Sequence, residues 1–181
     1  MRILITGAGG LLGGRLATLL SAHHETTALV RQQKAPERLP SVHTDLTDHA
    51  AVANTLRSLR PEAVVHCAAL ADPEVAEADP DRARRENEQA TRNLADACRG
   101  VSARLIAIST DLVFPGDKPF WNEGSPTGPV MEYGRSKLRA EAAARGLTVA
   151  QKPDSHNICF IPDGDTRGWL ADRVGAEQGA I

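Results

Sequence analysis

A run of glycines directly after a short apolar segment constrains the fold of this chain more than any other feature of its sequence. Residues 2–6 are typical of a buried strand, and residues 11–20 carry leucines at helical spacing. Between them, Gly7 allows a sharp turn, Gly10 leaves room for a pyrophosphate, and Gly13 lets the helix pack close to the strand. This order predicts a dinucleotide site in which N–H groups at the helix N-terminus bind phosphates. A glycine-rich turn without a ligand is the alternative.

Strand-like and helix-like segments alternate along the first 145 residues. We predict further strands at residues 26–30, 41–45, 63–69 and 104–109. We predict helices from about residue 48 to 60, capped by Thr47 or Asp48, then at residues 81–100, ended by Gly100, and at residues 133–145. Polar or Pro- and Gly-rich composition predicts loops at residues 32–40 and 114–130. The alternation predicts an α/β fold with a Rossmann-type, doubly wound parallel sheet.

Composition restricts the compartment and the partners. The hydrophobic content of 41% supports a core, and the net charge of −2 gives no broad positive field, so a nucleic-acid partner is not expected. The three cysteines have no metal-ligand spacing and suggest no disulfide framework. Because no apolar run has the length of a membrane span and no signal-peptide pattern is present, we expect a cytoplasmic protein without a membrane partner.

Two residues at predicted strand ends bear on the choice of cofactor. Arg31 follows the second strand, where an acidic residue would select a free ribose 2′-hydroxyl and an arginine can accommodate a 2′-phosphate. Arg31 therefore favours NADP(H) over NAD(H), although a solvated arginine is an equal alternative. Asp45 follows the third strand and is placed to bind an adenine amino group or to serve as a turn residue.

The fourth strand and the helix after it carry further polar residues. The strand ends in Ala68 and Ala69, which are small enough to let a cofactor lie close, whereas His66 and Cys67 are interpreted as core residues. The charged residues between positions 82 and 88 are interpreted as the solvated face of the helix.

Tyr133 and Lys137 lie four residues apart and therefore share one face of the last predicted helix. An ammonium beside a phenol lowers the phenol pKa, which is normally about 10. Such a tyrosine can exchange a proton with a carbonyl or alcohol oxygen near neutral pH. The Thr110 hydroxyl is placed to hold the same oxygen while a nicotinamide exchanges hydride. A surface tyrosine with a nearby lysine is the alternative.

Together these motifs resemble the extended short-chain dehydrogenase/reductase family, and within it the dTDP-4-dehydrorhamnose reductases. The matching segments are TGAGGLLG (6–13), DLTD (45–48), HCAA (66–69), Asn87, STDLVFPG (109–116) and YGRSK (133–137). The resemblance departs at Leu112, where these reductases usually carry a tyrosine.

The resemblance implies catalytic roles for Thr110, Tyr133 and Lys137, and it implies that the lysine also bonds the nicotinamide ribose. The cofactor-binding residues that we predict are Gly7, Gly10, Leu11, Leu12, Gly13, Arg31, Asp45, Leu46, Ala68, Ala69, Asn87, Tyr133 and Lys137. No metal ligands are predicted.

The remaining residues, 146–181, differ in character from residues 1–145. Residues 147–165, with the distinctive core DSHNICF (154–160), resemble a segment of the bacterial tRNA-specific 2-thiouridylases, which implies a sulfur-carrying role for Cys159. We therefore expect two units: an NAD(P)-binding domain at residues 1–145 and a thiouridylase-like fragment at 146–181 with a largely irregular tail. This arrangement predicts a chimera that lacks the reductases' substrate domain, with residues 147–150 replacing a missing sixth strand.

These expectations define one principal function and two alternatives. The principal one is an NAD(P)-dependent reductase, truncated, acting on a carbonyl of a small molecule that resembles a nucleotide-sugar. The alternatives are a non-catalytic NADP-binding regulatory module and a fragment for tRNA 2-thiouridine synthesis. A homodimer or a regulatory partner is compatible with the first two.

Overall fold

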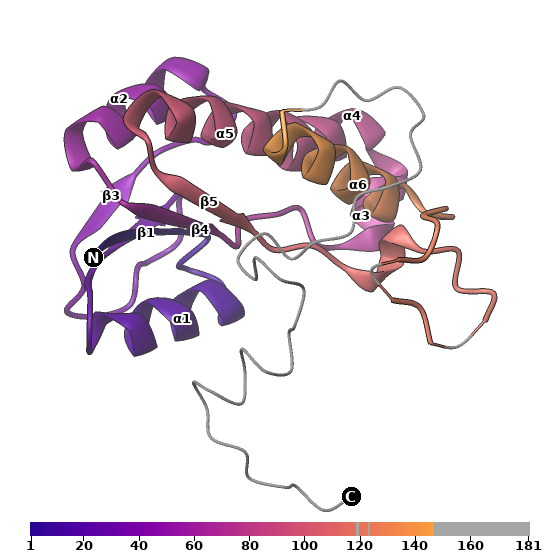
Figure 1. Cartoon of the computed structure of the whole chain (residues 1–181), viewed down its shortest axis with the longest axis horizontal. Coiled ribbons are helices and arrows are strands. Elements are labelled where there is room, and N and C mark those ends of the chain that lie inside the picture. The colour runs from indigo at the N-terminus through magenta and orange to yellow at the C-terminus, as the bar shows by residue number, and fades with distance from the viewer. Residues whose placement is uncertain (119, 123, 147–181) are drawn as a thin grey trace, which may run out of the picture.

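Five parallel strands form the centre of the structure, a computed structural model that describes residues 1–118, 120–122 and 124–146 (Figure 1). Their order in the sheet is β3-β2-β1-β4-β5. The strands are β1 (Arg2–Thr6), β2 (Glu25–Val30), β3 (Ser41–His43), β4 (Ala63–His66) and β5 (Arg104–Ala107). The chain starts in the middle of the sheet, builds outward to β3 and then crosses back to β4. The predicted Rossmann-type parallel sheet is confirmed.

Helices cover both faces of this sheet (Figure 1). Helix α1 (Leu11–Ser21) lies on one face, and α2 (His49–Leu59), α5 (Ala90–Val101) and α6 (Glu132–Ala144) lie on the other. The alternation of β1 side chains explains the two layers. Ile3 and Ile5 pack into the cluster beneath α1, whereas Leu4 packs with residues of α2 and α5. Both faces of the sheet are therefore apolar, as parallel sheets require.

The α2 boundaries follow the predicted signals. The Asp48 carboxylate accepts the Ala51 N–H at 3.0 Å, which confirms Asp48 rather than Thr47 as the N-cap. At the other end, Arg60 adopts a left-handed conformation with φ of 46°, and Pro61 follows it. Within the described residues, the predicted loops at 32–40 and 114–130 contain no helix or strand, as expected.

The segment predicted as one helix at residues 81–100 is different. It consists of α4 (Pro80–Ala83), a π-helical segment η1 (Arg84–Gln89) and α5. Gly100 does not end the helix, because α5 continues to Val101 and Ser102 takes the left-handed conformation with φ of 58°. The sequence analysis also missed α3 (Pro73–Ala78), which Asp72 caps by accepting the N–H groups of Glu74 and Val75.

Three strands are shorter than predicted at their carboxyl ends. β3 ends at His43, β4 ends at His66 and β5 ends at Ala107. The residues predicted to continue these strands instead form loops along one edge of the sheet, and a short 3₁₀ turn, η2 (Asp111–Val113), follows the β5 loop. Ligands of open parallel sheets bind at this edge.

Some predictions lie outside the described residues. They include the sixth strand at residues 147–150, the irregular tail and the surroundings of Cys159. Among the helices that the structure describes, none has both the length and the apolar character that a membrane span needs.

Candidate functional site

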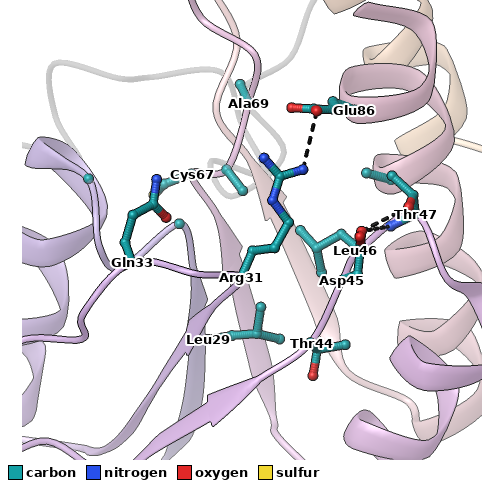
Figure 2. A pocket seen from close by; sticks show the side chains of 14 residues that line it. Leu29, Arg31, Gln33, Thr44, Asp45, Leu46, Thr47, Cys67, Ala69 and Glu86 are labelled. Carbon is teal, nitrogen blue, oxygen red and sulfur yellow. Dashed lines mark hydrogen bonds and ion pairs between the residues drawn. The ribbon is translucent and has the colours of Figure 1, made fainter. Parts of the chain in front are cut away.

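A cavity of about 170 Å³ lies at the carboxyl ends of the first four strands (Figure 2). It is placed where the chain leaves β1 toward β2 on one side and reaches β4 on the other, which is the topological switch point of the sheet. The cavity is lined by seven of the predicted cofactor-binding residues, namely Gly7, Gly10, Arg31, Asp45, Leu46, Ala68 and Ala69. The structure therefore brings these residues together, although their role in binding stays a prediction.

The glycine turn closes the cavity at the end of β1. Gly7 has a φ of 67°, and a Cβ atom there would lie 2.6 Å from the Ala68 nitrogen. A Cβ atom on Gly13 would lie 2.3 Å from the Gly7 carbonyl oxygen, so the start of α1 is pressed against the turn. Both positions therefore exclude any side chain, as the glycine pattern predicts.

The N-terminus of α1 faces the same cavity and fits a phosphate group. Gly10 is the N-cap and lines the cavity, and it has no side chain that could accept the N–H groups of the first turn. The predicted residues Leu11 and Leu12 occupy that turn, and Leu11 is 95% exposed. An uncapped helix end with positive dipole character is the chemistry that binds a pyrophosphate.

Charged side chains from three elements meet at the far side of the cavity (Figure 2). Arg31 Nη1 lies 3.2 Å from Glu86 Oε1, and Glu86 also accepts a bond from Arg82 Nε at 3.0 Å. Asp45 Oδ1 accepts bonds from the N–H and the hydroxyl of Thr47 at 2.9 and 2.8 Å. These two hydrogen bonds, with a smaller contribution from the Arg31 charge, lower the pKa of Asp45. Asp45 is thus a turn residue that also lines the cavity.

Glu86 is a site residue that the sequence analysis missed. The charged run at 82–88 was interpreted as a solvated face, but the side chains of Glu86 and Glu88 are only 19% and 14% exposed. Glu86 lines the cavity, and Glu88 pairs with Arg84 and Arg92 away from it. Charge patterning alone gives no signal that these two carboxylates are partly buried.

Asn87 is buried and lies between the β4 loop and α6. Its Oδ1 accepts the Leu70 N–H at 2.8 Å, and its Nδ2 donates to the Leu70 carbonyl oxygen at 3.1 Å and to Ser136 Oγ at 2.8 Å. Asn87 does not line the cavity. The structure therefore shows it as a link that positions α6, and a direct role in cofactor binding stays a prediction.

Thr110, Tyr133 and Lys137 form a second cluster next to the β4 and β5 ends. Tyr133 is partly buried, and it packs against the apolar cluster of Leu70, Ala76 and Ala83. Burial raises the pKa of the Tyr133 phenol, a hydrogen bond with Thr110 opposes this increase, and the Asp111 charge adds to it. The close packing of α6 on η2 depends on Gly134, where a Cβ atom would lie 2.2 Å from the Leu112 carbonyl oxygen.

Lys137 does not act on Tyr133 as we predicted. Its Nζ donates to the Ile108 carbonyl oxygen at 2.6 Å, and burial lowers the pKa of Lys137 against the opposing charges of Glu141 and Cys67. Burial is the largest cause of the shift in the Tyr133 pKa, which is raised rather than lowered. The predicted electrostatic effect is therefore wrong for this structure, because the ammonium binds the β5 loop. The catalytic roles themselves stay predictions.

His66 and Cys67 follow the interpretation as core residues only in part. Cys67 lines the cavity, and burial raises the pKa of its thiol while the Lys137 charge opposes this. His66 is 2% exposed and lies between two hydroxyl groups, 2.7 Å from Thr6 Oγ1 and 3.1 Å from Thr91 Oγ1. Because the Thr91 hydroxyl donates to the Asn87 carbonyl oxygen, Nε2 carries the proton and Nδ1 accepts from Thr6.

Because the folded chain keeps His66 neutral, we predict that the folding stability of the chain decreases at acidic pH. Burial, followed by the Lys137 charge, lowers the pKa of His66 from 6.5 to about 3. The unfolded chain therefore binds one more proton than the folded chain between these values, and the stability that is complete above pH 6.5 decreases toward pH 3. Between pH 7 and pH 5 we expect this residue to cost about 2 kcal/mol of unfolding free energy. Urea unfolding of the wild type and of His66→Gln at both pH values measures this decrease in unfolding free energy. An equal decrease in the two proteins would contradict the prediction.

Sheet order, glycine turn and cavity position define a Rossmann-type dinucleotide fold. The chain belongs to the family described as the RmlD substrate binding domain, whose family model matches residues 1–152.

Solved structures agree with this family. A hypothetical dTDP-4-dehydrorhamnose reductase from Sulfolobus tokodaii is 33% identical with a TM-score of 0.75, covering 80% of this chain and 52% of that one. The dTDP-4-dehydrorhamnose reductase from Bacillus anthracis in complex with NADP is also 33% identical, with a TM-score of 0.71 and coverages of 81% and 49%. UDP-glucose 4-epimerase from Brucella ovis in complex with NAD is 28% identical, with a TM-score of 0.72 and the same coverages. This chain spans about half the length of these proteins.

A second similarity concerns the C-terminal part of the chain. The tRNA-specific 2-thiouridylase MnmA of Clavibacter sepedonicus is 81% identical over 47 residues, which are 26% of this chain and 12% of that protein. Because only 29 residues follow residue 152, at least 18 of the 47 matched residues lie within the stretch that the reductase family also matches. The resemblance to both families is thus confirmed, and the sulfur-carrying role of Cys159 stays a prediction.

Proposed function

We propose that this chain binds a nicotinamide dinucleotide and reduces a carbonyl group of a small molecule that resembles a nucleotide-sugar. The observation that carries this proposal is the cavity at the sheet switch point with an uncapped helix N-terminus on one side and the Thr110–Tyr133 pair beside the adjacent strand ends. The relatives that are named as reductases and epimerases, with NADP or NAD bound, support it. Arg31 at the end of β2 favours NADP(H).

Each residue of the second cluster has a defined task in this reaction. A bound nicotinamide would supply the hydride. Burial keeps Tyr133 protonated at neutral pH, so its hydroxyl is a proton donor for the carbonyl oxygen. The Thr110 hydroxyl, which lies near enough to influence the pKa of Tyr133, would hold the same carbonyl oxygen. Lys137 holds the β5 loop, which carries Thr110, through the Ile108 carbonyl oxygen. Cofactor phosphates would lie at the Gly10 end of α1.

Cofactor binding is the first test. We expect NADPH at a hundredfold excess over its Kd to stabilise the chain by about 2.7 kcal/mol. This corresponds to an increase in Tm of roughly 5 to 10 °C for a chain of this size. Thermal unfolding with NADPH, NADH and no ligand measures the effect. No increase in Tm with either dinucleotide would contradict the proposal.

Gly10→Asp provides a matched variant for this test. The Gly10 backbone is extended, and a Cβ atom there meets only the Gly7 carbonyl oxygen, at 3.3 Å. Aspartate is a good N-cap, so the Tm of the free chain should change little. Its carboxylate would occupy the N–H groups of the first turn and repel the phosphates, so the increase in Tm with NADPH should disappear. An unchanged increase would mean that the dinucleotide binds elsewhere.

A further inference from the structure

Arg31 and Glu86 both line the cavity and form an ion pair there (Figure 2). Arg31 follows β2, whereas Glu86 lies on η1, which precedes α5. The Glu86 carboxylate is the more buried partner, at 19% exposed against 44% for the Arg31 side chain. Arg82, which is 41% exposed, binds the same carboxylate oxygen of Glu86. Arg82, four residues before Glu86, therefore holds the Glu86 carboxylate in place while Glu86 contacts Arg31.

The ion pair with Glu86 reduces the positive charge that Arg31 presents to a ligand. The Arg31 guanidinium faces Glu86 directly, and the Asp45 carboxylate lies close enough for its pKa to respond to the Arg31 charge. The Arg31 charge is therefore opposed by the carboxylates of Glu86 and Asp45, with Arg82 bound to the same Glu86 oxygen. A phosphate that binds Arg31 must also replace Glu86 as its partner or lie near that negative charge. An uncharged ribose 2′-hydroxyl meets no such repulsion, and it can donate a hydrogen bond to a carboxylate.

Resting on the proposed dinucleotide function, we propose that Glu86 is a specificity-determining residue that limits the preference of this site for NADP(H) over NAD(H). It does so by pairing with Arg31 at the wall of the cavity and by opposing a second phosphate. Arg31 and Glu86 therefore set cofactor choice as a pair, although they come from segments 55 positions apart in the sequence.

Glu86→Gln tests this role, because it removes the charge and keeps the shape of the side chain. We expect the Kd ratio of NADH to NADPH to increase about fivefold, the size expected for one partly exposed ion pair. Isothermal titration calorimetry of both dinucleotides with the full chain measures the ratio. Glu88→Gln is the matched control, since Glu88 lies on the same segment and pairs with Arg84 and Arg92 outside the cavity.

A second background shows whether Glu86 acts through Arg31. In Arg31→Gln, the added Glu86→Gln change should raise the Kd ratio by less than it does in the wild type, because the partner is gone. Equal increases in the two backgrounds would overturn the paired mechanism.

The remaining outcomes separate this inference from the function on which it rests. If both dinucleotides bind and Glu86→Gln leaves the ratio unchanged, the inference is wrong and the proposed function stands. An equal increase in the Kd ratio of Glu88→Gln would also overturn the inference, because the loss of any negative charge on this segment would then change the ratio. If neither dinucleotide binds the wild type, both the inference and the proposed function fail.

Discussion

Gly13→Ala should destabilise the chain by more than about 3 kcal/mol, which is a large fraction of the total stability of a typical domain. The added Cβ would lie 2.3 Å from the Gly7 carbonyl oxygen and 2.7 Å from the Gly7 carbonyl carbon. Both are backbone atoms, so no side-chain rotation relieves the contact. Gly7 cannot retreat, because its own Cα faces the backbone of Cys67 and Ala68 at the end of β4. The whole glycine turn would have to move away from the sheet.

Helix propensity alone predicts the opposite sign for this substitution. Alanine is favoured over glycine in a helix interior by about 1 kcal/mol. Gly100→Ala is the matched control, since Gly100 also lies in a helix and a Cβ atom there meets nothing within 4 Å. We expect Gly100→Ala to stabilise the chain by roughly 0.5 to 1 kcal/mol. Urea unfolding of both variants compares them, and a Gly13→Ala variant as stable as the wild type would show that the turn is not tightly packed.

The fold could be predicted from the sequence because its local signals support one another. Residues 2–13 contain an apolar strand, three glycines and a helix start, and each of these signals agrees with its neighbours. Four further apolar runs, most of them separated by helical segments, leave few topologies once crossovers are right-handed. The Asp48 cap and the Pro61 break were visible because each acts on its own backbone or that of near neighbours.

The missed features depend on contacts between distant segments. Asn87, which lies in the π-helical segment η1, forms hydrogen bonds with the Leu70 N–H and the Ser136 hydroxyl. These partners are distant in the sequence, so local propensity does not predict them. Ser102 rather than Gly100 ends α5, although glycine is the residue that usually does so. Glu86 was overlooked for the same reason, since its partner Arg31 belongs to another element.

The spacing of Tyr133 and Lys137 identified a pair on one helix face but not the direction in which each side chain points. Helical spacing of four residues brings two Cα atoms together and leaves several rotamers open to a lysine. Here the Ile108 carbonyl oxygen takes the ammonium. Consequently, burial, Thr110 and Asp111 decide the pKa of Tyr133, and these effects depend on tertiary structure.

Tyr133→Phe should therefore lower the rate of carbonyl reduction by at least about 100-fold, the loss expected when a general acid is removed. The ring remains to pack against Leu70, Ala76 and Ala83, so the Tm should change little. Oxidation of NADPH, followed by the absorbance of the reduced nicotinamide, measures the rate with a nucleotide-linked keto-sugar. Arg135→Gln is the control, because Arg135 lies on the same helix with an exposed side chain. A variant that reduces the substrate as fast as the wild type would exclude Tyr133 as the proton donor.

The protonation state behind this prediction can be measured directly, because Tyr133 is the only tyrosine of the chain. An alkaline titration of phenolate absorbance therefore reports this one residue. We expect its midpoint to lie above 10, since burial raises the pKa of Tyr133. Lys137→Gln should leave the midpoint unchanged. A midpoint below 10 that increases in Lys137→Gln would contradict this expectation, because it would show that the Lys137 ammonium lowers the pKa of Tyr133. Tyr133 would then act as a phenolate near neutral pH rather than as a protonated donor.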